Sequence, residues 1–90
     1  MVKQTITVTN KSGLHLRPAT ELSKIAGKLN SDITIIDGEK QINPKSTLIL
    51  MSAGIKKGTT IEIQCEGETE EEDLQVMLDA IAGGLGEETD

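Results

Sequence analysis

Aromatic residues are missing from this sequence, since its 90 residues include no Phe, Trp or Tyr. A stacking platform for RNA bases and an aromatic-lined groove for proline-rich peptides both need such rings, so these binding modes are excluded. The core must be built from Ile, Leu, Val, Met and Ala. A chain of this length forms one core, and we expect a single domain over residues 1–90 with a loose tail at 87–90.

Cysteine and histidine are scarce, and each occurs once, as Cys65 and His15. A lone cysteine forms no intramolecular disulfide, which favours a reducing compartment, and such a chain cannot build a Cys/His zinc site. The sequence also lacks a nucleotide-binding glycine loop, an apolar run long enough to span a membrane and a signal peptide. We therefore expect a cytoplasmic protein with no metal, no other cofactor, no inserted membrane segment and a buried Cys65 thiol.

The net charge is −6, and it is unevenly distributed. Residues 66–90 contain ten acidic and no basic residues, whereas residues 1–65 contain nine basic and five acidic residues. This acidity argues against a nucleic-acid partner, because phosphate backbones bind basic surfaces. We expect residues 70–73 to be a solvated helix face that lies away from His15. The surface that receives partners is expected to be apolar and locally basic, with Arg17, Lys24 and Lys45 supplying the charge.

Apolar periodicity predicts alternating strands and helices. The expected strands cover 2–8, 33–36, 40–42 and 61–65, and the expected helices cover 16–29, 47–52 and 70–85. Asp37-Gly38 predicts a tight hairpin between the second and third strands. Ser46 is expected to cap the N-terminus of the second helix, and Thr69 with Glu72 is expected to form a capping box at the start of the last helix. Gly83-Gly84 is expected to fray the end of that last helix. The order βαββαβα predicts an α+β fold, an open-faced sandwich with three helices on one face of a four-stranded, mostly antiparallel sheet.

The motif Gly13-Leu14-His15-Leu16-Arg17-Pro18 lies between the first strand and the first helix. It contains none of the usual capping residues, so we expect the first helical amides to be uncapped and to favour an anion. The same helix end favours a neutral His15 imidazole, which can attack phosphorus, and Arg17 would then pair with the phosphate. The motif predicts a phosphohistidine site, with a helix-capping histidine or a surface histidine on a partner-binding loop as alternatives.

Gly13-Leu14-His15-x-Arg17-Pro18-Ala19, with Lys45-Ser46 further along before a short apolar helix, resembles the HPr family. These proteins are the phosphocarriers of the bacterial phosphoenolpyruvate:sugar phosphotransferase system. The resemblance covers essentially the whole chain and implies an HPr-like fold. It implies that His15 accepts a phosphoryl group on Nδ1 from Enzyme I and passes it to IIA-type sugar-specific domains. In that reading Arg17 stabilises the phosphate, Leu16 and Arg17 form the anion-binding helix N-terminus, and the carrier is a monomer rather than an enzyme.

The resemblance also implies a docking face and a regulatory serine. The docking positions that it indicates are Thr20, Lys24, Thr47, Leu48 and Met51. Ser46 matches the serine that an ATP-dependent HPr kinase/phosphorylase modifies in many members, with a transcriptional regulator as a further partner. Pro44 and Ile49 depart from the family pattern there, so the sequence leaves open whether Ser46 is modified or only caps its helix.

Three alternative functions remain open at this point. One is a regulatory protein that signals mainly through a phosphate on Ser46, and another is a carrier in a nitrogen-linked or dihydroxyacetone-kinase phosphorelay. The last is a small ligand-binding α+β domain in which the histidine motif is a coincidence. Two assignments are also left undecided: Met51 belongs either to the core or to the interface, and Lys56-Lys57 is expected to form a turn.

Overall fold

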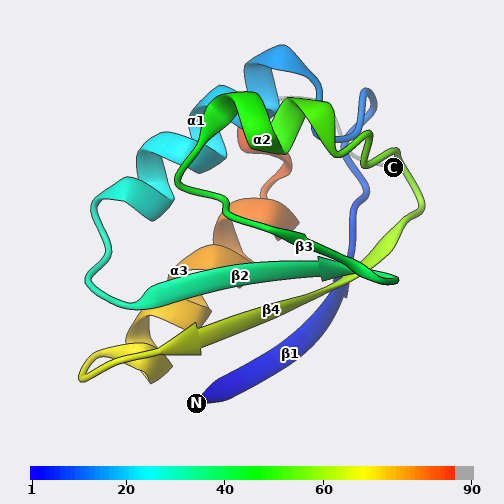
Figure 1. Cartoon of the computed structure of the whole chain (residues 1–90). Coiled ribbons are helices and arrows are strands. Elements are labelled where there is room, and N and C mark those ends of the chain that lie inside the picture. The colour runs from blue at the N-terminus through cyan, green and yellow to red at the C-terminus, as the bar shows by residue number, and fades with distance from the viewer. Residues whose placement is uncertain (87–90) are drawn as a thin grey trace.

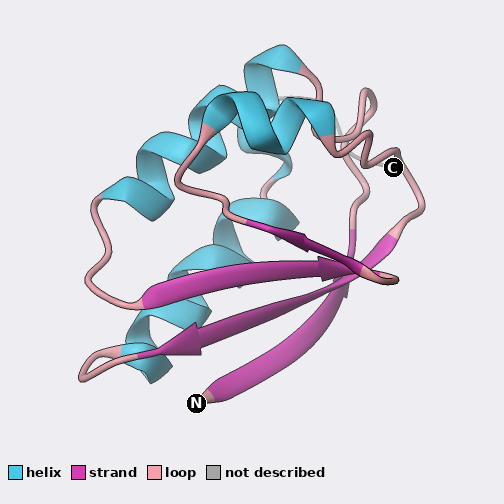
Figure 2. Cartoon of the chain, in the orientation of Figure 1, coloured by secondary structure: helices cyan, strands magenta, loops and turns pink. Residues whose placement is uncertain are grey.

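The computed structural model describes residues 1–86, and its elements follow the expected βαββαβα order with one further 3₁₀ turn at the end. The elements are β1 (Val2–Thr7), α1 (Leu16–Gly27), β2 (Asp32–Asp37), β3 (Lys40–Ile42), α2 (Thr47–Ser52), β4 (Thr60–Glu66), α3 (Glu70–Ala82) and η1 (Gly84–Gly86). The helices lie on one face of the sheet (Figures 1 and 2). The predicted α+β open-faced sandwich is therefore confirmed, whereas the expected tail at 87–90 lies outside the described residues.

Residues 1–86 form a four-stranded sheet in the order β1-β4-β2-β3, in which every pairing is antiparallel. The predicted hairpin between β2 and β3 is confirmed. Asp37 pairs with Lys40, so Gly38 and Glu39 form the turn, and Gly38 has a φ of +62° that glycine adopts without steric cost. The central position of β4 joins the N-terminal strand to the β2–β3 hairpin.

A single layer of aliphatic side chains fills the space between the sheet and the helices. Ile61, Ile63 and Cys65 alternate along β4 and are buried, as the period-two pattern predicts. Burial raises the pKa of the Cys65 thiol, and the carboxylates of Asp73 and Glu70 add to the rise. The thiol therefore stays protonated and acts as a core side chain, as expected.

The ends of the helices differ from the predictions in three places. α1 ends at Gly27, before the expected Leu29. The capping box at Thr69 is wrong, because its hydroxyl donates to Asp73 (Oγ1–Oδ2 2.8 Å) and makes no cap hydrogen bond. The expected fraying at the end of α3 is also wrong. The chain turns into η1 instead and buries Leu85, although this residue has a φ of +51°.

The two ends of the sheet separate the histidine motif from the acidic cluster. Thr7, the last residue of β1, pairs with the beginning of β4, and Val2 pairs with Cys65 near its end. The loop before α1 therefore lies at one end of the sheet and the start of α3 at the other (Figure 1). The expectation that residues 70–73 lie away from His15 is confirmed. Within the described residues, the structure has no helix that is long and apolar enough to cross a membrane.

Candidate functional site

The loop between β1 and α1 is fixed against the segment that leads into β4. Val8 N donates to Thr59 O (2.9 Å), and Leu14 N donates to Ile55 O (2.9 Å). Gly13 has a φ of +63°, and a Cβ there would clash with the carbonyl oxygen of Ile55. Only glycine fits this conformation and this close approach. Gly13 thus fixes the position of the loop that carries His15.

His15 is the N-cap residue of α1. Its backbone is extended (φ −78°, ψ −166°), and its Nδ1 accepts a hydrogen bond from Leu16 N at 2.9 Å. An accepting Nδ1 carries no proton, so the ring is the neutral tautomer with its proton on Nε2. The prediction that every first-turn amide is uncapped is therefore wrong for Leu16, because the exposed imidazole itself caps it.

The amide of Arg17, the next residue along α1, has no such cap within residues 1–86. Pro18 has no N–H, and Ala19 N donates to His15 O (2.9 Å), the first hydrogen bond of the helix. Among the described residues, the Arg17 amide is left without an acceptor at the positive end of the helix dipole. The Arg17 side chain is exposed, and its Nε lies 4.0 Å from the position that a Cβ on Gly86 would take. Its guanidinium arm therefore lies beside η1 in this structure.

A pocket of about 200 Å³ opens beside the imidazole. Its lining residues are Ser12, Leu14, His15, Met51, Gly54, Ile55 and Lys56. Met51 is half-buried, packs against the core and also lines this pocket, so its core role is confirmed and its interface role stays a prediction. Within residues 1–86 there is no cluster of three or more His, Cys, Asp and Glu side chains that could hold a metal ion.

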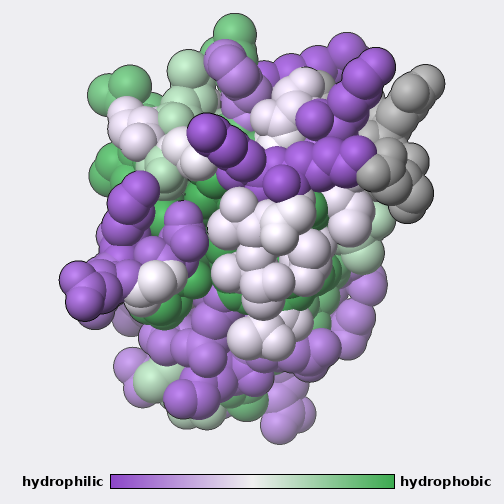
Figure 3. Space-filling model, turned by 90° about the vertical axis from the view of Figure 1, so that its right-hand side faces the viewer, coloured by the Kyte–Doolittle hydropathy of each residue, from purple (hydrophilic) through white to green (hydrophobic). Residues whose placement is uncertain are grey.

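α2 adds exposed apolar surface to the site. Ser46 is its N-cap, as predicted, with Oγ accepting from Ile49 N at 3.3 Å. Leu48 is 72% exposed, Ile49 46% and Leu16, on α1, 59%. Figure 3 shows hydrophobic side chains gathered in the upper part of one side of the molecule, at the height of α1 and α2 in Figure 1. These exposed apolar side chains lie on adjacent helices, where the family resemblance implies a docking face, and that role stays a prediction.

The other expected docking residues have mixed environments. Thr47 is half-buried at the start of α2. The Thr20 hydroxyl donates to Leu16 O (2.7 Å) within α1. Lys24 is exposed, and its Nζ lies 4.0 Å from a carboxylate oxygen of Glu21. Lys24 is therefore accessible to a partner, whereas Thr20 already uses its donor inside the helix.

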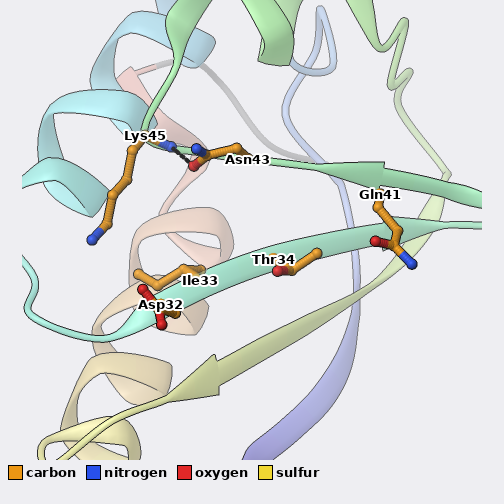
Figure 4. Close-up of a pocket in the computed structure, with 6 residues that line it drawn as sticks. All are labelled: Asp32, Ile33, Thr34, Gln41, Asn43 and Lys45. Carbon is orange, nitrogen blue, oxygen red and sulfur yellow. Dashed lines mark hydrogen bonds between the residues drawn. The ribbon is translucent and has the colours of Figure 1, made fainter.

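Lys45 does not contribute its charge to this surface, and that part of the sequence interpretation is wrong. Its Nζ donates to Leu29 O (3.2 Å) and Ser31 O (2.9 Å), the carbonyls that follow α1. Figure 4 shows the side chain extending toward the beginning of β2, beside a separate pocket of about 310 Å³ whose lining does not include His15. Carbonyls beyond a helix C-terminus attract a cation, and they hold this ammonium away from the docking face.

A buried hydrogen-bond network that the sequence did not predict connects this lysine to α3. Asp73 accepts hydrogen bonds from Ser31 N (3.0 Å), Ser31 Oγ (2.5 Å) and Thr69 Oγ1 (2.8 Å). The bond from the Ser31 hydroxyl is the main cause that lowers the pKa of the Asp73 carboxyl. Asp73 is buried, so its assignment to a solvated acidic face is wrong. Ser31 therefore connects two parts of the chain, because it is hydrogen-bonded both to Lys45, which precedes α2, and to Asp73 in α3.

Comparisons with known proteins agree with this fold. A family model described as the PTS HPr component phosphorylation site matches residues 2–83. The phosphocarrier protein HPr of Mycoplasma capricolum is 46% identical over 77 residues, or 86% of either chain. The crystal structure of HPr from Thermoanaerobacter tengcongensis has a TM-score of 0.92 at 38% identity and covers 98% of this chain and 99% of its own. Crh of Bacillus subtilis, solved as an intertwined, domain-swapped dimer, has a TM-score of 0.73 at 32% identity and covers 94% and 98%.

This open-faced sandwich is the fold of HPr structures, and HPr proteins are phosphoryl carriers. The chain belongs to the HPr family, the phosphocarriers of the phosphoenolpyruvate:sugar phosphotransferase system. The family, the fold and the carrier function inferred from the sequence are thereby confirmed. The alternative of a ligand-binding domain with a coincidental histidine motif is set aside.

Proposed function

We propose that His15 carries the phosphoryl group. The observation that supports this most strongly is the exposed imidazole whose Nδ1 lone pair is held at the N-terminus of α1 by the Leu16 amide. A neutral, unprotonated ring nitrogen is the nucleophile that phosphoryl transfer needs, and the Leu16 amide gives up its hydrogen bond to Nδ1 as the attack proceeds. The proton on Nε2 leaves that lone pair available without a separate general base.

The transfer moves one phosphoryl group between two nitrogens. The Nδ1 lone pair attacks the phosphorus of a phosphohistidine on the donor protein, and the donor's N–P bond breaks. Its electron pair returns to the donor ring, which leaves as a neutral imidazole because its other nitrogen carries a proton, while His15 keeps its Nε2 proton and becomes a phosphorylated imidazolium. In the second transfer, a histidine nitrogen or cysteine sulfur of the acceptor attacks the phosphorus, the N–P bond of His15 breaks, and His15 returns to its neutral form. The donor and acceptor sites supply most of the transition-state stabilisation, so this chain is a co-substrate and not an enzyme.

The start of α1 is suited to hold the product. Once Nδ1 is bonded to phosphorus it no longer accepts from Leu16 N, so that amide becomes free to donate to a phosphoryl oxygen. The Arg17 amide, which has no acceptor among residues 1–86, supplies a second donor. The Arg17 guanidinium reaches the same oxygens by a rotamer change of an exposed side chain, away from Gly86. The Leu16 amide is thus hydrogen-bonded both before and after transfer.

The partners of this carrier are Enzyme I as donor and IIA-type domains as acceptors. The exposed Leu16, Leu48 and Ile49, the pocket wall at Met51 and the accessible Lys24 support one docking surface around His15 for both. We place the carrier in the cytoplasm as a single-domain monomer. Light scattering in solution tests the oligomeric state, and a mass of two chains would contradict it.

Ser46 is proposed as a second, regulatory phosphorylation site. It caps α2 with its hydroxyl and is half-buried next to the exposed Leu48. A phosphate there would remain compatible with the helix N-terminus but would add negative charge to the docking surface and weaken its binding to acidic partners. HPr kinase/phosphorylase and ATP should then label wild type and not Ser46→Ala.

The test of the proposed function is labelling with radioactive phosphoenolpyruvate and Enzyme I. Wild type and Ser46→Ala should both acquire phosphate that is labile in acid and stable in base, and His15→Ala should acquire none. Label that persists in His15→Ala would assign the phosphate elsewhere. Wild type that stays unlabelled with several Enzyme I homologues would contradict the carrier function for these partners.

A further inference from the structure

Lys56 shares a pocket with His15. The pocket lies between the end of the β1–α1 loop, which contributes Leu14 and His15, and the segment after α2, which contributes Ile55 and Lys56. From this placement we propose that the Lys56 ammonium is a second cation of the site and pairs with the phosphoryl group on His15. The proposal rests on the proposed function of His15. It extends the sequence interpretation, in which Lys56 only forms a turn.

The backbone of Lys56 is held close to the histidine motif. A Cβ on Gly13 would lie 2.7 Å from the Cα of Lys56, so the two backbones are in contact. The Leu14 N to Ile55 O hydrogen bond (2.9 Å) fixes the same pair of segments one residue away. Lys56 therefore projects its four-carbon stem from a point fixed relative to His15, and its exposed end can follow the phosphoryl group.

Three other cations near the docking surface are bound or directed elsewhere, and the accessible Lys24 does not line the pocket. Lys45 is bound to the carbonyls beyond α1, and Lys40 Nζ donates to Ala53 O (3.2 Å). Arg17 lies beside Gly86 and does not line the pocket. Within residues 1–86, Lys56 is the cationic residue that lines the same pocket as the imidazole, and it forms no ion pair there.

A cation at this place has two measurable consequences. A phosphoryl group on histidine carries up to two negative charges near neutral pH, so an adjacent ammonium favours the phosphorylated protein over the free one. It also favours the dianion over the monoanion, which lowers the pH at which the phosphoryl group titrates. Because Lys56 is exposed, we expect each effect to be modest, on the order of 3- to 10-fold in an equilibrium constant.

The experiment compares Lys56→Met with Lys56→Arg and with Lys3→Met. Lys3 is exposed on β1 opposite Gln64, at the end of the sheet away from His15, so its substitution removes the same charge elsewhere. Each protein is equilibrated with Enzyme I, phosphoenolpyruvate and pyruvate, and the phosphorylated fraction is measured. The isolated phosphorylated proteins are then titrated by 31P NMR, which detects the phosphoryl group without any partner.

For Lys56→Met we expect an equilibrium constant for phosphorylation about 3- to 10-fold lower and a 31P midpoint about 0.5–1 pH unit higher. Lys56→Arg and Lys3→Met should match wild type in both. Equal values for Lys56→Met and Lys3→Met would overturn the role of Lys56 while leaving His15 phosphorylation intact. An unchanged 31P midpoint with a raised KM for Enzyme I would also overturn it, because Lys56 would then bind an acidic partner. Wild type that takes no label would instead refute the proposed function.

Discussion

Asp73→Asn should destabilise the fold strongly although it alters no residue near His15. The carboxylate is 6% exposed and accepts hydrogen bonds from Ser31 N, Ser31 Oγ and Thr69 Oγ1. All three donors meet the same oxygen, Oδ2, so the amide oxygen of Asn can take its place but accepts these bonds without the negative charge. Hydrogen bonds to a buried charged group contribute about 1.5–3 kcal/mol, so we expect a loss of about 2 kcal/mol and a Tm lower by about 8–16 °C.

The pH dependence of that loss has a defined sign. Hydrogen bonding lowers the pKa of the Asp73 carboxyl below its ordinary 3.8. The stabilisation is therefore complete above about pH 3.8 and is lost as the pH falls through the lower folded-state pKa. The difference between wild type and Asp73→Asn should shrink below that pH. Part of the acid sensitivity should remain in the variant, because the Gly67 amide and the N-terminal amine also lower the pKa of Glu70.

Urea unfolding at a series of pH values measures both effects. Asp79→Asn is the matched control, because Asp79 is exposed on the same helix and accepts from Gln75 Nε2 (2.8 Å) at the surface. Its free energy of unfolding should change by less than about 0.5 kcal/mol. If Asp73→Asn behaved like Asp79→Asn at neutral pH, or kept a constant difference from wild type down to the lowest pH, the network would not stabilise the fold as argued.

Three further substitutions test the site and its surface. Gly13→Ala should lower the free energy of unfolding by more than about 2 kcal/mol and slow phosphorylation by Enzyme I. The control is Gly54→Ala, which is also at positive φ (+67°) but has no atom near its Cβ position, and it should lower the free energy of unfolding by about 1 kcal/mol. Ser46→Ala should cost about 1 kcal/mol by loss of the N-cap, measured by thermal unfolding, and no change would contradict that cap. Leu48→Asp should raise the KM for Enzyme I at unchanged Tm, since Leu48 is 72% exposed; an unchanged KM would place docking elsewhere.

The parts of the fold that depend on local pattern were predictable. The alternation of Ile61, Ile63 and Cys65 predicted which face of β4 is buried, and Asp37-Gly38 predicted the hairpin. Ser46 became an N-cap as expected, because a serine before an apolar helix has few competing partners. Each of these depends on residues a few positions apart, where propensity and pattern agree.

Long-range hydrogen bonds account for the errors at Asp73 and Lys45, and through Asp73 they contribute to the one at Thr69. Thr69 fails as a side-chain cap because it donates to Asp73, one turn further along α3, and Asp73 also binds Ser31, which is 42 positions away in sequence. The Lys45 ammonium donates to Ser31 O, a carbonyl that is 14 positions away in sequence. The fold brings this carbonyl close to Lys45, and no local sequence pattern predicts that contact. The sequence alone does not predict such contacts, because Asp73 and Lys45 are each charged residues of the kind that is usually solvent-exposed.

At the candidate site, the motif identified the residue that matters but not its surroundings. His15 could be selected from the sequence because it is the sole imidazole and precedes an amphipathic helix without ordinary capping residues. The sequence offered a helix-capping histidine only as an alternative to the phosphohistidine site, since histidine is an uncommon N-cap, and in the structure the ring does cap Leu16. The sequence gave no indication that Lys56 shares a pocket with His15, because the two meet only where the β1–α1 loop packs against the segment after α2.

The central claim is that the phosphoryl group is carried on Nδ1 of His15, at the helix end formed by the Leu16 and Arg17 amides. NMR of the 15N-labelled, phosphorylated protein measures this directly through the phosphorus–nitrogen coupling and the amide shifts. We expect the coupling to appear at Nδ1 and the Leu16 and Arg17 amide protons to move downfield as they donate to phosphoryl oxygens. Coupling at Nε2, or a phosphorylated protein with both amide resonances unmoved, would contradict the account.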